Sequence, residues 1–129
     1  MPVGTVLVVD DDPVIVNLLR VNFEIEGYTV LTATTGEAGL AQARSGGPDV
    51  IVLDVMMPGM DGIEVARRLR SEEDTRKIPI IMLSAKAQSS DIQAGLLVAD
   101  EYVTKPFEPI ELLDRVATAL ARAQSGNAR

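Results

Sequence analysis

Five short runs of aliphatic and β-branched residues recur along the chain, spaced so that a helix can lie between each pair. This alternation constrains the fold more than any other feature. Each run is apolar throughout, which is typical of strands that are buried on both faces of a sheet. The sequence therefore predicts five strands, over Thr5–Val9, Tyr28–Ala33, Val50–Leu53, Ile80–Leu83 and Tyr102–Thr104.

The segments between the strands carry helix signals. Asp12 and Pro13 are typical of a helix cap and a first helical position, and Gly27 is typical of the residue after a helix. Helical crossovers join parallel strands and cover both faces of their sheet, so we predict a doubly wound α/β fold with a five-stranded parallel sheet. The predicted helices run from Pro13 to Glu26, from Thr34 or Thr35 to Gly46 and Gly47, and over about Gly62–Ser71, Ser89–Leu97 and Pro109–Ala123.

The length of 129 residues is typical of one domain. Hydrophobic residues make up 47% of the chain and charged residues 24%, a balance that favours a packed core over disorder. We predict one domain over residues 1–123, followed by a polar tail or the start of a linker over residues 124–129.

Several function classes are disfavoured by composition. The chain contains neither cysteine nor histidine, so any chemistry rests on carboxylates, hydroxyls and lysines. The net charge of −7 repels a phosphate backbone, which argues against direct nucleic-acid binding. No apolar run approaches the roughly 20 residues that span a membrane, and the start of the chain lacks a basic leader. We expect a cytoplasmic protein without membrane contact.

The informative side chains follow the predicted strands. Asp10 and Asp11 come after the first strand, Asp54 after the third, Ser84 after the fourth and Lys105 after the fifth. Ligands of doubly wound sheets bind beyond the carboxyl ends of the strands, where these side chains converge. Closely spaced carboxylates repel one another unless a cation lies among them, and oxygen ligands favour Mg²⁺ (or Mn²⁺). Lys105-Pro106 is also a candidate cis peptide bond.

Four motifs in this order resemble the response-regulator receiver family, whose members include chemotaxis receivers. The resemblance runs from about Thr5 to Ala123 and implies a flavodoxin-like strand order of 2-1-3-4-5. The motifs are Val8-Val9-Asp10-Asp11-Asp12, the segment Leu53–Gly62, Leu83-Ser84-Ala85-Lys86, and the segment Tyr102–Phe107.

The resemblance implies a role for each site residue. It makes Asp54 the phosphoacceptor and makes Asp11, Asp54 and the Met56 carbonyl the Mg²⁺ ligands, with Asp10 acting through water. It also implies phosphoryl contacts from Lys105, Ser84 and the backbones of Met56 and Ala85, and a switch pair formed by Ser84 and Tyr102.

The resemblance also implies partners. A sensor histidine kinase or a histidine phosphotransfer protein would supply the phosphoryl group, because this chain has no histidine. The downstream effector is not defined by the sequence, and a phosphorylation-linked homodimer is a further expectation. The chain would be a signalling switch and not an enzyme, beyond catalysing its own phosphoryl transfer and dephosphorylation. The alternative is a degenerate receiver that binds partners without phosphorylation.

Two features depart from or go beyond the family pattern. The turn Val98-Ala99-Asp100 is one residue shorter than usual, which predicts a distortion after the fourth helix. In the first helix, Ile15, Leu19 and Phe23 form the expected core stripe. A second stripe beside it is either part of a wide buried face or a docking surface for the kinase; it comprises Val14, Leu18, Val21 and Ile25.

Overall fold

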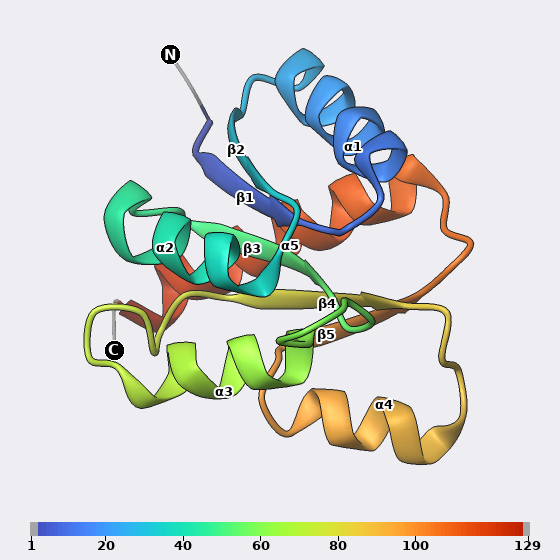
Figure 1. The fold of residues 1–129 in the computed structure, drawn as a ribbon. Coiled ribbons are helices and arrows are strands. Elements are labelled where there is room, and N and C mark those ends of the chain that lie inside the picture. The colour runs from blue at the N-terminus through green and yellow to red at the C-terminus, as the bar shows by residue number, and fades with distance from the viewer. Residues whose placement is uncertain (1–2, 128–129) are drawn as a thin grey trace.

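One parallel sheet lies at the centre of the computed structural model, which describes residues 3–127 (Figure 1). Its strand order is β2-β1-β3-β4-β5, which confirms the predicted fold class. Asp54 and Ser84 are the last residues of their strands, so the two side chains stand at the carboxyl edge. The strands are β1 (Thr5–Val9), β2 (Thr29–Ala33), β3 (Val50–Asp54), β4 (Ile80–Ser84) and β5 (Glu101–Thr104).

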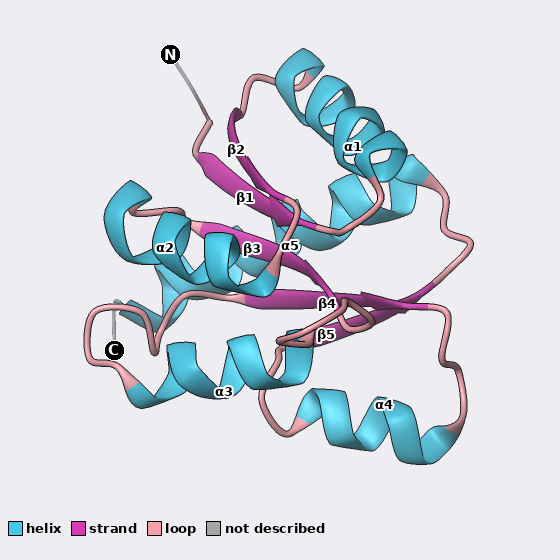
Figure 2. Ribbon diagram, in the orientation of Figure 1, coloured by secondary structure: helices cyan, strands magenta, loops and turns pink. Residues whose placement is uncertain are grey.

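Helices cover both faces of the sheet (Figure 2). The caps lie where the sequence predicts them: Asp12 accepts a hydrogen bond from Val14 N, and Thr35 accepts one from Ala38 N. Gly47 ends the second helix with a φ of 58°, a conformation that glycine adopts without strain. The helices are α1 (Pro13–Ile25), α2 (Gly36–Gly46), α3 (Gly62–Ser71), α4 (Ser89–Leu96) and α5 (Pro109–Asn127).

The end of α5 differs from the prediction. The helix continues to Asn127, whereas the sequence analysis ended it at Ala123. No proline follows Ala123, so nothing blocks the helical hydrogen bonds, and a single glycine such as Gly126 costs only about 1 kcal/mol. Whether residues 124–129 begin a linker stays a prediction, and residues 128–129 lie outside the described part.

Two hydrophobic cores pack against the sheet, one on each face. Helices α1 and α5 pack on one face, and α2 and α3 pack on the other. In α1 the buried stripe contains Val16 together with the predicted Leu19 and Phe23, whereas Ile15 is only partly buried. None of the helices within residues 3–127 is both long enough and apolar enough to cross a membrane.

The turn between α4 and β5, over Val98–Asp100, is held by one arginine. Arg70, in the last turn of α3, donates from Nε to the Val98 carbonyl at 2.9 Å and from Nη2 to Asp100 Oδ2 at 2.8 Å. Its Nη1 donates to the carbonyls of Arg76 and Ile78 at 2.8 and 2.7 Å. The same Asp100 oxygen accepts the Ile80 N–H at 2.8 Å. One guanidinium thus ties α3, the start of β4 and the turn before β5 together.

This network predicts that Arg70→Lys will lower the free energy of unfolding by about 1–3 kcal/mol, because an ammonium cannot satisfy four separated acceptors. Urea denaturation followed by circular dichroism measures the change. Arg67→Lys is the matched control: Arg67 lies on the same helix, is 63% exposed and, among the residues that the structure describes, pairs only with Glu64. The control should change stability by less than about 0.5 kcal/mol. Equal effects of the two substitutions would contradict the role of Arg70.

Candidate functional site

The site residues lie at the carboxyl ends of four strands, at one edge of the sheet. Asp10 follows β1 directly, and Lys105 follows β5 directly. Because β1, β3, β4 and β5 are neighbours in this order, these two residues meet Asp54 and Ser84 at that edge. The sequence predicted this convergence, although positions 10 and 105 are 95 residues apart.

Three carboxylates gather at this edge. One oxygen from each of Asp10, Asp11 and Asp54 lies within 4.8 Å of the other two. Asp10 and Asp54 are 0% and 2% exposed, whereas Asp11 is exposed. Two such charges 4 Å apart repel by about 4 kcal/mol at an effective dielectric of 20. Three oxygen donors with one open side suit a hard divalent cation, and Mg²⁺ commonly keeps several waters in sites of this kind.

Lys105 supplies positive charge inside the cluster. Its Nζ lies 3.0 Å from Asp10 Oδ2 and 3.3 Å from Asp54 Oδ1. Burial lowers the pKa of Lys105, but the hydrogen bond to Asp10 and the charges of both acids outweigh burial, so the pKa lies above its usual value. The ammonium is therefore charged at neutral pH. The bond between Lys105 and Pro106, a cis candidate in the sequence, is cis.

Asp54 is an unusually basic carboxylate. Burial and the nearby charge of Asp10 raise its pKa from 3.8 to about 6, although Lys105 and a 3.3 Å hydrogen bond from Met56 N oppose this rise. A more basic carboxylate is a better nucleophile once it is deprotonated. Asp10, by comparison, is held in place by the Asp12 N–H at 2.9 Å and by Lys105.

Ser84 and Tyr102 are connected through a third residue. The buried Ser84 hydroxyl accepts a hydrogen bond from Lys86 N at 3.0 Å, and the Tyr102 hydroxyl donates to the Lys86 carbonyl at 2.8 Å. Both backbone polar groups of Lys86 are therefore held by the predicted switch residues. No side-chain pattern in the sequence reveals this role of the Lys86 backbone.

Gly62 is a second residue whose role the sequence analysis missed. A Cβ at this position would overlap the carbonyl oxygen of Asp54, and the Gly62 N–H donates to the Val55 carbonyl at 2.9 Å. The first turn of α3 thus packs directly on the backbone that carries Asp54. A glycine one residue after the helix cap Asp61 is the signal that could have revealed this close approach.

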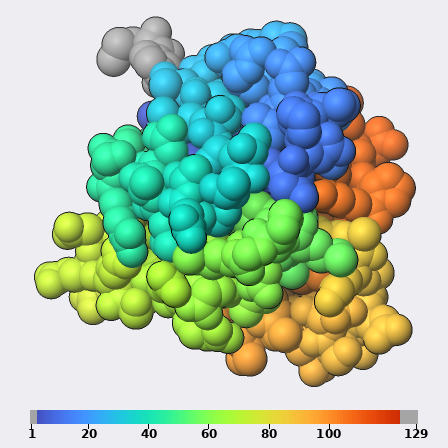
Figure 3. Space-filling model, in the orientation of Figure 1, coloured from blue at the N-terminus to red at the C-terminus, as the bar shows by residue number. Residues whose placement is uncertain are grey.

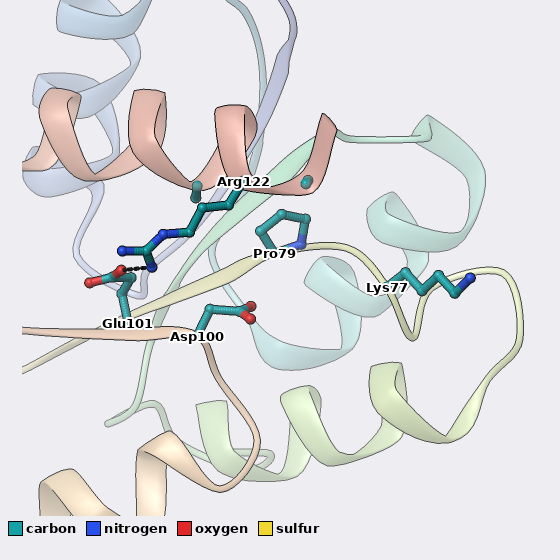
Figure 4. A pocket seen from close by; sticks show the side chains of 7 residues that line it. Lys77, Pro79, Asp100, Glu101 and Arg122 are labelled. Carbon is teal, nitrogen blue, oxygen red and sulfur yellow. Dashed lines mark hydrogen bonds and ion pairs between the residues drawn. The ribbon is translucent and has the colours of Figure 1, made fainter. Parts of the chain in front are cut away.

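A separate hollow lies at the other end of the strands, on the amino side of the sheet. It has a volume of about 240 Å³ and lies where β4 and β5 begin, beside the last turns of α5. Figure 4 shows Arg122 reaching Glu101, with Nη1 and Oε2 3.0 Å apart. Lys77, Pro79 and Asp100 complete the labelled lining. Because none of the residues at the carboxyl edge contributes to it, this hollow is separate from the carboxylate cluster.

Comparison with known proteins yields a family match. The model of the response regulator receiver domain matches residues 6–117. The alkaline phosphatase synthesis transcriptional regulatory protein PhoP of Bacillus subtilis is 49% identical over 120 residues, which are 92% of this chain and 49% of that protein. The master transcriptional regulator RpaA of Synechocystis is 46% identical, over 91% of this chain and 49% of its own. The chain spans about half the length of these relatives.

The solved structures that this chain resembles are also response regulators. The receiver domain of the Francisella response regulator 1452 has a TM-score of 0.86 and 37% identity, covering 92% of this chain and 98% of its own. The chemotaxis response regulator CheY4 of Vibrio cholerae has a TM-score of 0.85 and 34% identity, covering 90% of this chain and 98% of its own. These similarities extend over the strands that carry the carboxylate cluster.

The pKa of Asp54 predicts a stability effect in metal-free protein. The folded state holds the Asp54 proton up to pH about 6 and the unfolded chain only up to 3.8, so stability falls as the pH rises through this window. Asp54→Asn should therefore raise the free energy of unfolding at pH 7.5 by about 1–2 kcal/mol, with the gain shrinking toward pH 4. Thermal and urea denaturation at several pH values measure this.

The matched control is Asp114→Asn, at an exposed position on α5, which should change stability by less than about 0.5 kcal/mol. A lower stability of Asp54→Asn than of the parent protein at pH 7.5 would show that Asp54 is not strained by its neighbours.

Proposed function

Because the chain belongs to the family of response regulator receiver domains, we propose that it is a phosphorylation-dependent signalling switch with Asp54 as its phosphoacceptor. The observation that carries the proposal is the carboxylate of Asp54, which is almost completely buried beside Lys105 and two further acids. A structural aspartate rarely has such surroundings, because burying acids together costs stability.

In the proposed reaction, an Asp54 oxygen attacks the phosphorus of a phosphohistidine on a partner protein. A P–O bond forms as the P–N bond breaks. The phosphohistidine ring carries a proton on its other nitrogen, so it leaves as a neutral imidazole. Bound Mg²⁺ would neutralise charge on the phosphoryl oxygens. The residues that would hold the ion are Asp11, Asp54 and the Met56 carbonyl, with Asp10 acting through water.

The remaining contacts would hold the phosphoryl group once it is attached. Lys105 already lies 3.3 Å from Asp54 Oδ1, so its ammonium can follow the phosphoryl oxygens with little movement. The Met56 N–H, which now donates to Asp54, and the Ala85 N–H would bind further oxygens. Ser84 is the remaining donor, because its hydroxyl can rotate from Lys86 N toward the phosphoryl group.

The switch would act through the segment that follows β4. When the Ser84 hydroxyl turns to the phosphoryl group, it releases the Lys86 N–H, while the Tyr102 hydroxyl still holds the Lys86 carbonyl. A change at Asp54 would then reach the aromatic ring on β5 through one peptide unit. The surface formed by α4, β5 and α5 is the region where we expect effector binding or a phosphorylation-linked homodimer.

The proposed partners follow from the same chemistry. The phosphoryl donor would be a sensor histidine kinase or a histidine phosphotransfer protein, and the site of action the cytoplasm. Several relatives are named transcriptional regulators, but this chain matches only about half of each. With a net charge of −7, the domain itself would signal by protein contacts instead of direct DNA contact.

The test is to incubate the protein with Mg²⁺ and acetyl phosphate and to follow its intact mass. We expect one added phosphoryl group in the parent protein and none in Asp54→Asn or in metal-free buffer. Lys105→Met should lower the rate at least tenfold, because the ammonium no longer stabilises the transferring group. No mass gain by the folded protein, with a known receiver phosphorylated alongside, would favour the alternative of a phosphorylation-independent interaction domain.

The second stripe of α1 supports a docking role in the transfer. Its side chains are exposed instead of forming a wide buried face: Val14 is 73% exposed and Ile25 75%, with Leu18 and Val21 at 42% and 40%. Figure 3 shows α1 in blue at the surface of the molecule, with the orange segment near the start of α5 beside it. An apolar helix face next to the site edge suits a partner helix that carries the phosphohistidine.

Accordingly, Val14→Asp combined with Val21→Asp should slow phosphotransfer from the cognate kinase at least tenfold, because each buried interface charge is costly. The rate with acetyl phosphate should not change, since this donor needs no docking surface. Ala38→Asp combined with Ala41→Asp, at two exposed positions of α2, is the charge-matched control and should leave both rates intact. Unchanged transfer from the kinase to the double variant would exclude the α1 surface as the docking site.

A further inference from the structure

We propose that Gly95 is a positioning residue that sets the place of the Tyr102 ring and thereby couples α4 to the switch; the coupling rests on the function proposed above. A Cβ on Gly95 would lie 2.6 Å from Cδ2 and 2.7 Å from Cε2 of Tyr102. Real Cβ atoms are not found so close to other heavy atoms. Any side chain at position 95 must therefore displace either the ring or the helix.

The contact is important for α4 because this helix is otherwise weakly attached. Gly95 is the buried residue of α4, whereas Leu96 and the following Leu97 are 46% and 86% exposed. Glycine inside a helix costs stability relative to alanine, so its position here needs a compensating contact. The Cδ2–Cε2 edge of the Tyr102 ring provides this contact. The place where α4 docks on β5 is thus defined by the ring lying against a glycine.

The same ring is also held near the other end of α4. The Tyr102 hydroxyl donates to the Lys86 carbonyl at 2.8 Å, in the loop between β4 and α4 (Figure 1). One end of the tyrosine is therefore fixed by the loop that leads into α4, and its ring edge lies against the last turn of the helix. A ring that turns as Ser84 changes partner must shift α4, because Gly95 leaves no space between them.

The sign of one substitution distinguishes this role from simple helix propensity. If the glycine were a neutral surface residue, Gly95→Ala would stabilise the helix and lower the unfolding equilibrium constant by up to about fivefold. We expect the opposite, an increase of at least about fivefold, because the methyl group meets the ring. Ala94→Gly, at the exposed neighbouring position, calibrates the propensity effect on the same helix and should raise the constant by about fivefold.

A double-mutant cycle then assigns the effect to Tyr102. In a Tyr102→Ala background the ring is absent, so Gly95→Ala should become stabilising and the sign of its effect should reverse. Urea denaturation of the four proteins measures the cycle. Stabilisation by Gly95→Ala in the parent protein, or an equal destabilisation in both backgrounds, would overturn the proposal.

A spectroscopic measurement reports the ring directly and does not depend on stability. The chain has two tyrosines, so fluorotyrosine labelling gives two ¹⁹F resonances, with Tyr28 as an internal reference. Gly95→Ala should shift the Tyr102 resonance and leave that of Tyr28 in place. An unchanged Tyr102 resonance would overturn the proposed contact.

Phosphorylation with acetyl phosphate and Mg²⁺ completes the test. In the parent protein the Tyr102 resonance should move as the mass gains a phosphoryl group. In Gly95→Ala the mass gain should persist while the movement of the resonance is reduced at least twofold. An identical movement in both proteins would overturn the coupling. If the parent protein gains no mass, the function proposed above fails, and the urea cycle alone decides the role of Gly95.

Discussion

Electrostatic repulsion at the carboxyl edge of the sheet is the constraint on which the rest of the site depends. Two buried acids and one exposed acid share a space of a few ångströms, with a single ammonium among them. The hydrophobic cores on both faces provide the stability that tolerates this arrangement. The edge is therefore a region of unfavourable negative charge, which a divalent cation bound among the three acids would relieve.

Much of this arrangement follows from local sequence. The apolar runs, the cap at Asp12 and the glycine at position 47 each act within a few residues, so they predict elements and boundaries closely. Parallel pairing then brings Asp10, Asp54 and Lys105 together without further information. The end of α5 was wrong in the prediction because polar residues without a proline are compatible with either helix or coil. The burial of Val16 depends on the rotation of α1 against the sheet, which the sequence pattern fixes only approximately.

Contacts between distant segments could not be predicted in the same way. Arg70 binds acceptors up to 30 residues away in the sequence. Gly95 lies against the ring of Tyr102 on the next strand, which leaves no space for a side chain. Both concern the turn before β5, where the family resemblance offered least guidance. In the structure this turn is held by Arg70 and Asp100 on one side, and on the other side α4 has one buried residue, Gly95. The start of β5 is thus tied to α3 through Asp100 and Arg70, whereas most side chains of α4 face solvent.

The position of Lys105 in the chain has a consequence for synthesis on the ribosome. All three acids of the cluster lie within the first 54 residues, but Lys105, the lysine beside them, follows the last strand, β5. A nascent chain that has emerged only as far as β4 carries the negative charges without their cation. Lys105 can reach Asp10 and Asp54 only when β5 has paired with β4 at the edge of the sheet. Completion of the charge cluster is in this way postponed until the whole sheet has been translated.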